Sequence, residues 1–233
     1  MLLINNTNTN AYFNLAMEEY FLKNTNEDIF LLWQNENSII VGKNQNTLSE
    51  INYDYVKENN IKVVRRLSGG GAVFHDLGNI NFTFISCNDN SFSDFKKFTM
   101  PIVEALKELN VHAEFSGRND LLIDGQKFSG NAQYNYKNKV MHHGTLLFSS
   151  EINDLSNALK VKPSKFQGKS VKSVKSRVTN ISSHLDKKMT VLEFKYYLMD
   201  FINKRDENSH FYELNDKDVE SINNLGEEKY STW

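Results

Sequence analysis

The apolar residues at the start of the chain predict one helix followed by strands. Asn10 suits the N-cap of a helix over residues 11–23, because the apolar residues of this range recur at helical spacing. Two apolar runs, 29–33 and 38–42, flank the polar stretch 34–37. This pattern is typical of two strands joined in a β-hairpin.

The next part of the chain mixes short helices and strands. We expect a short helix over residues 48–60 and a buried strand at 61–64. A second strand is predicted at 81–87, after a Gly-Asn turn. Residues 93–110 place their apolar side chains on one helical face, with Pro101 inside the helix.

Two consecutive hairpins are predicted in the middle of the chain. Asp124-Gly125 lies between two apolar runs and matches a type I′ turn, whose two central residues both need positive φ. A second hairpin is expected over residues 129–148, turning near Lys137-Asn138. These hairpins favour an antiparallel or mixed sheet.

The last third of the chain has the pattern of helices and loops. Thr190 and Glu193 form a capping box ahead of an apolar helical face. No internal repeat or low-complexity linker divides the sequence. We therefore expect one domain over residues 1–233 of the α+β class, with a mixed or antiparallel β-sheet flanked by helices.

Composition narrows the class of protein without identifying a function. With 233 residues, 39% of them hydrophobic, the chain can bury a sizeable core. Its net charge of −2 gives no general attraction to nucleic acid or membranes. Cys87 is the only cysteine, which excludes an internal disulfide, and neither a signal sequence nor a membrane-spanning stretch is evident. We expect a cytoplasmic protein.

The most informative motif is the run over residues 65–76, Arg-Arg-Leu-Ser-Gly-Gly-Gly-Ala-Val-Phe-His-Asp. Three consecutive glycines indicate backbone that passes close to a ligand, typically one with phosphate oxygens, although a tight structural turn is the competing interpretation. Arg66 and His75 could supply charge and hydrogen bonds. Because a buried strand precedes the run and would deliver it to a cleft, the ligand interpretation is favoured.

The first predicted hairpin brings Asp120 and Lys127 near each other. Asp120 is a candidate for holding Mg²⁺ beside a nucleotide, or is simply a turn cap. Lys127 could place its ammonium on a phosphate or carboxylate, or could be an ordinary solvent-facing lysine.

Three further features of the sequence could carry chemistry or bind a partner. His142 and His143 are adjacent on a predicted strand and so face opposite sides, which excludes a shared zinc ion; one should face the cleft. Cys87 could be an acyl-carrying nucleophile, but no histidine or lysine stands at a suggestive offset, so an inert thiol is favoured. The basic run 160–177 is either a solvated loop or a surface for an anionic partner.

Several ordered motifs resemble those of lipoate-protein ligase A, a family grouped with biotin protein ligases and octanoyltransferases. The resemblance implies a biotin/lipoate ligase-like catalytic domain. It is carried by residues 13–19, 32–35, 42–46, 65–76, 117–120, 127–130, 142–147 and 173–180. Two departures are mild: Lys43 stands where the family usually has arginine, and Thr47 where it usually has proline.

The resemblance implies a two-step ligase reaction without a covalent enzyme intermediate. Lipoate would attack the α-phosphorus of ATP, with Mg²⁺ as cofactor, to give lipoyl-AMP and pyrophosphate. A lysine amine on an acceptor would then attack the mixed anhydride. The acceptors would be lipoyl domains of 2-oxoacid dehydrogenase E2 subunits or the H protein of glycine cleavage; nucleic acid is not an expected partner.

The resemblance also assigns residues to roles. Lys127 would be catalytic and would contact both the lipoyl carboxyl and the α-phosphate, and Asp120 would hold Mg²⁺. The ATP and lipoyl-AMP site would further contain Arg66, Gly71, Ala72, Val73, Phe74, Asn119 and Asp120. The lipoate site would contain Trp33, Ser68, Gly69, Gly70, His75 and His143.

Family members usually continue for about another 100 residues, so the resemblance implies that a C-terminal accessory domain is absent from this sequence. In the family that domain supports adenylation. Three alternatives therefore stay open: a lipoyl or octanoyl transferase, a transferase that uses only preformed lipoyl-AMP and needs a separate accessory subunit, and a non-catalytic binding module.

Overall fold

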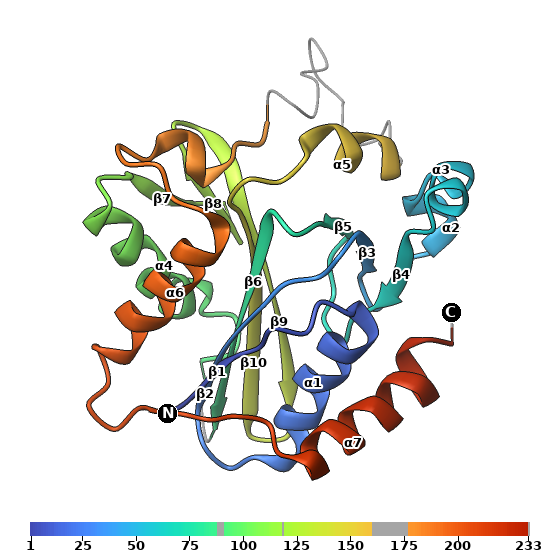
Figure 1. The fold of residues 1–233 in the computed structure, drawn as a ribbon, viewed down its shortest axis with the longest axis horizontal. Helices are drawn as coiled ribbons and strands as arrows, with labels where there is room; N and C mark the ends of the chain where they lie inside the picture. Colours follow the sequence, from blue (N-terminus) through green and yellow to red (C-terminus); the bar gives the residue numbers. More distant parts are fainter. Residues whose placement is uncertain (88–90, 118, 160–176, 233) are drawn as a thin grey trace.

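The computed structural model describes residues 1–87, 91–117, 119–159 and 177–232 (Figure 1). Apart from Arg177, the basic run therefore lies outside the described residues. The strands are β1 (Leu2–Asn5), β2 (Ile29–Trp33), β3 (Ser38–Val41), β4 (Lys62–Arg65), β5 (Ala72–His75), β6 (Asn79–Cys87), β7 (Ala113–Ser116), β8 (Asp120–Ile123), β9 (Gln126–Tyr136), β10 (Lys139–Leu147) and β11 (His210–Phe211).

The helices are α1 (Ala11–Asn24), α2 (Thr47–Glu50), α3 (Tyr53–Glu58), α4 (Phe95–Glu108), α5 (Ile152–Ala158), η3 (Ile181–His184), α6 (Val191–Asn203), α7 (Asp216–Leu225) and η4 (Gly226–Tyr230). Asn10 caps α1, and the Thr190–Glu193 capping box begins α6, as predicted. The predicted helix over 48–60 is instead two short helices, α2 and α3. In the described part of the chain, no helix has the length and apolar character needed to cross a bilayer.

The strands form two sheets. The large sheet has eight strands in the order β11-β1-β2-β6-β10-β9-β8-β7, and the small sheet has three in the order β4-β3-β5. Strand β1 runs parallel to β2 and β11, β3 runs parallel to β4, and the other pairs are antiparallel. The predicted α+β fold with a mixed sheet is confirmed.

The predicted hairpin of 29–33 with 38–42 is wrong. Strand β2 pairs with β1 and β6, whereas β3 belongs to the small sheet. The stretch between them crosses from one sheet to the other, and its first two side chains, Gln34 and Asn35, are buried: Asn35 accepts a hydrogen bond from Asn14 Nδ2 at 2.9 Å. Both strands are buried along their whole length rather than on alternate residues, which is typical of interior strands.

The two hairpins around β9 are confirmed. Asp124 and Gly125 have φ of 50° and 74°, as a type I′ turn requires, and Lys137 at the second turn has φ of 54°. Strand β8 pairs antiparallel with β9, and β9 pairs antiparallel with β10. The hairpins bring the start of β9 beside β8, as predicted from the sequence.

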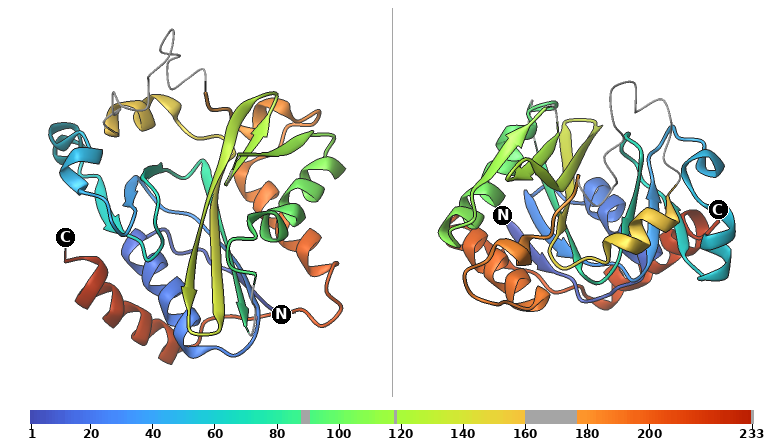
Figure 2. Two further views of the ribbon diagram at one scale, coloured as in Figure 1. Left: turned by 180° about the vertical axis from the view of Figure 1, so that it is seen from behind. Right: turned by 90° about the horizontal axis from the view of Figure 1, so that it is seen from above.

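Two cores lie on opposite faces of the large sheet. Strand β2 alternates between them, because Phe30 and Leu32 face the core under α4 and α6, while Ile29, Leu31 and Trp33 face the core under α1 and α7. Figures 1 and 2 show α4 and α6 together on one side and α1 with α7 on the other, next to the small sheet. The face under α1 therefore meets both sheets.

A buried carboxylate fastens α7 to α1. Asp218 accepts hydrogen bonds from Tyr20 Oη at 2.7 Å and from Tyr212 Oη. Burial alone would raise the pKa of Asp218, but the two hydroxyl donors, together with the Asn215 backbone N–H and the charge of Lys217, outweigh it, so the pKa lies below its usual value. The carboxylate contributes stability above the usual pKa of an aspartate, and this contribution is lost as the pH falls through the lower pKa of the folded state.

We expect Asp218→Asn to lower the free energy of unfolding at pH 7 by about 1–3 kcal/mol, because two tyrosine hydroxyls lose their charged, buried acceptor. The deficit should shrink below about pH 4, as wild-type Asp218 becomes protonated. Urea unfolding measures both effects. The control is Asp216→Asn, which removes the same charge from an exposed position of the same helix; equal losses in the two variants would contradict the interpretation.

Candidate functional site

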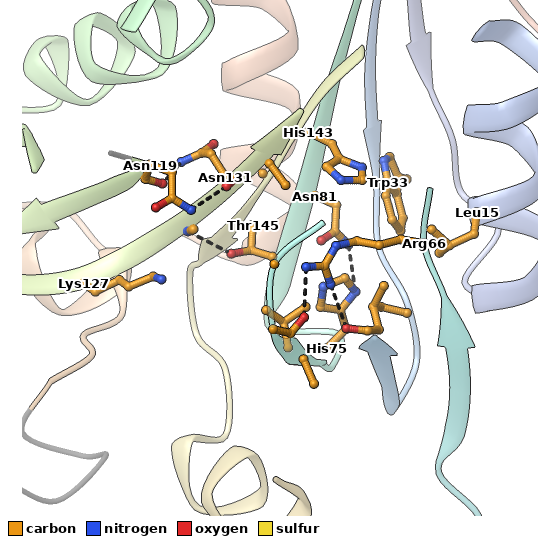
Figure 3. Close-up of a pocket in the computed structure, with 18 residues that line it drawn as sticks. Leu15, Trp33, Arg66, His75, Asn81, Asn119, Lys127, Asn131, His143 and Thr145 are labelled. Atoms are coloured by element: carbon orange, nitrogen blue, oxygen red, sulfur yellow. Dashed lines mark hydrogen bonds between the residues drawn. The ribbon is translucent and has the colours of Figure 1, made fainter. Parts of the chain in front are cut away.

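A cavity of about 220 Å³ lies between the large sheet and the glycine loop of the small sheet (Figure 3). Lys127 and Asn119 lie on one side of it, and Arg66, Trp33 and Leu15 lie on the other. The complete lining is Leu15, Trp33, Ile40, Arg66, Gly70, Gly71, Ala72, Val73, His75, Asn81, Asn119, Lys127, Gly130, Asn131, Ala132, His143, Gly144 and Thr145.

Arg66 organises the glycine loop. Its guanidinium donates to the carbonyl oxygens of Ile40 at 2.9 Å, Gly69 at 2.7 Å and Gly71 at 2.9 Å. Burial lowers its pKa to about 10, against the opposing effect of Glu18, so it remains a cation at neutral pH. Arg66 lines the cavity as predicted, and its hydrogen bonds go to backbone carbonyls of the loop and of β3 and to the Ser68 hydroxyl, which gives it a structural function.

The loop is also pressed against the end of β3. A Cβ atom on Gly42 would lie 2.0 Å from the carbonyl oxygen of Gly70, so only glycine fits there. Gly70 itself has φ of +99°, a conformation that residues with a side chain rarely adopt. By contrast, a Cβ atom on Gly69 would meet no heavy atom within 4 Å. Gly42 is therefore required by the close approach of the loop and Gly70 by its backbone conformation, whereas the space around Gly69 would admit a side chain.

His75 is a buried neutral imidazole. Asn35 Nδ2 lies 3.1 Å from its Nδ1 and Asn81 Nδ2 lies 3.5 Å from it, so both amides present donors to this nitrogen. The proton therefore resides on Nε2, which has no hydrogen-bond partner among the described residues. Burial, together with the nearby Arg66 and His143, lowers the pKa of His75 to about 3. It stays uncharged across the physiological range.

The two adjacent histidines face opposite sides of the sheet, as predicted. His143 lines the cavity, where Ser68 Oγ lies 2.6 Å from its Nε2 and Glu18 Oε1 lies 2.9 Å from its Nδ1. His142 stacks between Phe82 and Phe98 on the other face. Burial lowers the pKa of His142 to about 3, so it is a neutral packing residue.

Lys127 and Asp120 form an ion pair on the open side of the cavity, with 2.8 Å between Nζ and Oδ1. Their side chains are 39% and 36% exposed, so the pair contributes less than about 1 kcal/mol and leaves the ammonium available to another anion. A register shift between Leu121 and Leu122 bulges β9. A Cβ atom on Gly130 would lie 2.9 Å from Lys127 Nζ, so the lysine occupies the space over this glycine.

Two asparagines close the same side. Asn119 Nδ2 donates to the Asn131 carbonyl oxygen at 2.7 Å, and Asn131 Nδ2 donates to the Asn119 carbonyl oxygen at 3.0 Å. The backbone of Lys127 is held by hydrogen bonds with Arg177 and Thr179. The asparagine pair and these backbone hydrogen bonds together fix the position from which Lys127 reaches the cavity.

The structure brings together ten of the fourteen residues that the resemblance assigned to the site: Trp33, Arg66, Gly70, Gly71, Ala72, Val73, His75, Asn119, Lys127 and His143. Ser68, Gly69, Phe74 and Asp120 are not part of the lining. Phe74 packs instead into the core of the small sheet, because side chains alternate along β5 and His75 takes the cavity side. Ser68 and Asp120 each contact a lining residue, His143 and Lys127 respectively.

Sequence reasoning gave no role to several lining residues. These are Leu15, Ile40, Asn81, Gly130, Asn131, Ala132, Gly144 and Thr145. Most lie on strands of the large sheet, and they meet at the cavity because β6, β10 and β9 are neighbours in that sheet. The spacing of apolar residues along the chain does not show which strands are neighbours.

Cys87 lies outside the cavity, at the far end of β6. Asn81 on the same strand lines the cavity, and Cys87 lies six residues further along the strand, roughly 20 Å away. Burial raises the pKa of the Cys87 thiol, which disfavours the nucleophilic thiolate. The interpretation of Cys87 as an inert thiol fits this position.

We expect Gly42→Ala to destabilise the protein by about 1–3 kcal/mol, because the new methyl group must push the loop backbone away. Gly69→Ala, which meets no neighbour, should change stability by less than about 0.5 kcal/mol. Thermal unfolding of the two variants makes the comparison. Equal stability of both would show that the close approach of Gly42 to Gly70 does not constrain the loop.

Comparison with known proteins identifies the family. Residues 10–203 match the lipoyl protein ligase A/B catalytic domain. Lipoate-protein ligase LplJ of Bacillus subtilis is 51% identical over 239 residues, which cover 100% of this chain and 72% of that protein. Lipoate-protein ligase 1 of Staphylococcus aureus is 50% identical over 232 residues, covering 98% of this chain and 70% of that protein.

Solved structures agree with this result. A crystal structure of lipoate-protein ligase A bound with ATP matches with a TM-score of 0.84 at 26% identity, covering 99% of this chain and 96% of that one. The bi-partite lipoate protein ligase of Thermoplasma acidophilum also matches with a TM-score of 0.84, at 29% identity, covering 99% of this chain and 93% of that one. The chain therefore belongs to the lipoyl protein ligase A/B family.

Proposed function

We propose that this chain is an ATP-dependent lipoate-protein ligase that makes lipoyl-AMP and transfers the lipoyl group to a lysine of an acceptor protein. The observation that carries the proposal is the position of Lys127, an available ammonium on the cavity wall opposite the glycine loop. Two relatives of the chain, at 51% and 50% identity, are named lipoate-protein ligases, which supports the same activity.

The cavity offers different surfaces to the two ends of lipoyl-AMP. Leu15, Trp33, Ile40 and Val73 are apolar and suit the dithiolane ring and the aliphatic chain. His143 borders this part. Lys127, Asn119 and the loop backbone at Gly71 are polar and suit the phosphate and nucleoside. We place the acyl group toward Trp33 and the adenylate toward Lys127.

Lys127 would act in both steps. In the first, a carboxylate oxygen of lipoate bonds to the α-phosphorus while the bond to pyrophosphate breaks, and the ammonium reduces the repulsion between the two anions. In the second, the acceptor amine attacks the acyl carbon, AMP leaves and the nitrogen loses a proton. The ammonium would then stabilise the negative charge on the carbonyl oxygen and the departing phosphate.

The donor set near Lys127 is compatible with nucleotide-bound Mg²⁺. Mg²⁺ commonly takes only one or two protein carboxylates and completes its shell with phosphate oxygens and water. Asp120 supplies one partly exposed carboxylate, and the described residues contain no cluster of three His, Cys, Asp or Glu side chains. We propose Asp120 as the protein ligand, with the metal neutralising phosphate charge.

The acceptors and any accessory part are also proposals. A lipoyl domain of an E2 subunit accompanies the Thermoplasma ligase, and we propose lipoyl domains of 2-oxoacid dehydrogenases or the H protein as acceptors here. That ligase is bi-partite, and this chain spans 72% of its Bacillus relative. We therefore propose that a further domain or subunit supports adenylation, and that the reaction takes place in the cytoplasm.

We expect the chain, supplied with lipoate, MgATP and an accessory subunit, to release pyrophosphate and to lipoylate a lipoyl domain. Lys127→Ala should lower the rate of transfer from preformed lipoyl-AMP by roughly 10²–10³-fold, because a charge-stabilising donor is lost. Mass spectrometry of the acceptor measures this transfer, and Lys137→Ala, at an exposed turn, is the matched control. Wild-type transfer by the Lys127 variant would refute the assignment.

Cys87→Ser should leave ligation unchanged within about twofold, because the thiol lies at the far end of β6, roughly 20 Å along the strand from Asn81. The same assay tests the transferase alternative. Transfer of octanoyl groups from a carrier protein that disappears in the Cys87 variant would favour an acyltransferase with a cysteine nucleophile.

A further inference from the structure

A continuous chain of hydrogen bonds connects the apolar end of the cavity with the glycine loop. It runs through Trp33, Thr83, Glu18, His143, Ser68 and Arg66. Thr83 and Glu18, at its centre, are not among the lining residues and have no role in the proposed function.

The direction of each hydrogen bond in the first half is fixed. An indole can only donate, so Thr83 Oγ1 accepts from Trp33 Nε1 at 3.0 Å. The Thr83 hydroxyl then donates its own proton to Glu18 Oε1 at 2.6 Å. Thr83 is thus the link that holds the indole to the carboxylate.

The second half also ends on Glu18. Arg66 Nε donates to Ser68 Oγ at 3.1 Å, and in a neutral imidazole whose Nδ1 carries the proton, Nε2 accepts from the Ser68 hydroxyl at 2.6 Å. His143 Nδ1 then carries the proton donated to Glu18 at 2.9 Å. Donors from both ends therefore converge on one carboxylate, and this fixes the tautomer of His143.

The sheet register explains why these side chains meet. Thr83 of β6 is directly opposite His143 of β10, and Trp33 of β2 is opposite Asn81, two residues from Thr83. All three side chains therefore project from the face that α1 covers, and α1 supplies Glu18. Thr83 is 0% exposed and Glu18 is 1% exposed, so water cannot replace a lost partner.

We propose that Thr83 and Glu18 are positioning residues that hold the Trp33 indole and the His143 imidazole in place, and thereby set the width of the acyl site and its preference for the lipoyl group over a straight-chain acyl group. The inference rests on the proposed function, because it takes the acyl chain to lie against Trp33. Thr83 and Glu18 act through the two rings that border the cavity.

Thr83→Val keeps the shape of the side chain and removes only the hydroxyl. The sequence has two tryptophans, so a Trp233→Phe background leaves Trp33 as the single indole signal in an ¹H–¹⁵N spectrum. We expect the Trp33 Nε1–H resonance to move upfield and its hydrogen exchange to accelerate. The Kd for lipoate should rise roughly tenfold, and kcat/KM for lipoyl-AMP relative to octanoyl-AMP should fall by a similar factor.

Two further variants separate positioning from general damage. Thr83→Ser keeps the hydroxyl and should retain the wild-type resonance and selectivity. Thr99→Val removes another fully buried hydroxyl, which donates within α4 to the Phe95 carbonyl oxygen at 2.9 Å. This variant should change neither the Trp33 resonance nor the acyl selectivity. Glu18→Gln should weaken the hydrogen bond from His143 Nδ1, because an amide oxygen replaces a carboxylate oxygen, and the Nδ1 resonance in ¹⁵N spectra of the imidazole should shift.

An unchanged indole resonance and unchanged acyl selectivity in Thr83→Val would overturn the inference. So would equal effects of Thr83→Val and Thr99→Val on selectivity. If the wild-type chain transferred no lipoyl group, the proposed function would fail, whereas the indole resonance and the Kd for lipoate would still decide whether Thr83 positions Trp33.

Discussion

A buried guanidinium is the constraint on which the site depends. Arg66 is 8% exposed and must find partners inside the protein, and it finds them in the carbonyl oxygens of the glycine loop and of β3. A buried cation with fewer acceptors would be costly, so the loop and the arginine stabilise each other. Gly42 allows this arrangement because it has no side chain where Gly70 approaches.

The two sides of the cavity differ in how firmly they are held. On the Trp33 side, buried groups are joined by hydrogen bonds whose directions leave little freedom, as at His143 and His75. On the other side, Lys127 is partly exposed and forms an ion pair with Asp120, which is partly exposed as well. A fixed wall suits recognition of an apolar acyl chain, whereas a lysine in a weak ion pair can follow the charge as it moves between carboxylate, phosphate and carbonyl oxygen.

Local signals were sufficient for much of the fold. The Asn10 cap, the Thr190–Glu193 capping box and the Asp124-Gly125 turn depend on neighbouring residues, and the structure has all three. The hairpin predicted across residues 34–37 was wrong because short apolar runs do not show which strands they pair with. Pairing is decided by contacts between residues far apart in the chain.

The same distinction applies to the site. The resemblance of motifs indicated Lys127 and the glycine loop, and both lie at the cavity. It could not separate residues that face the cavity from neighbours that face away, as with Phe74 and His75 on one strand. Nor could spacing reveal Thr83 or Glu18, whose importance arises only when three strands and α1 come together.

The central claim is that one cavity holds both ends of lipoyl-AMP, with Lys127 at the junction. A crystal structure of the chain with lipoyl-AMP tests this claim most directly. We predict that Lys127 Nζ lies within hydrogen-bond distance of the acyl carbonyl oxygen and of the phosphate, and that the dithiolane ring packs near Trp33. A phosphate bound away from Lys127, or an acyl chain outside the cavity, would contradict the account.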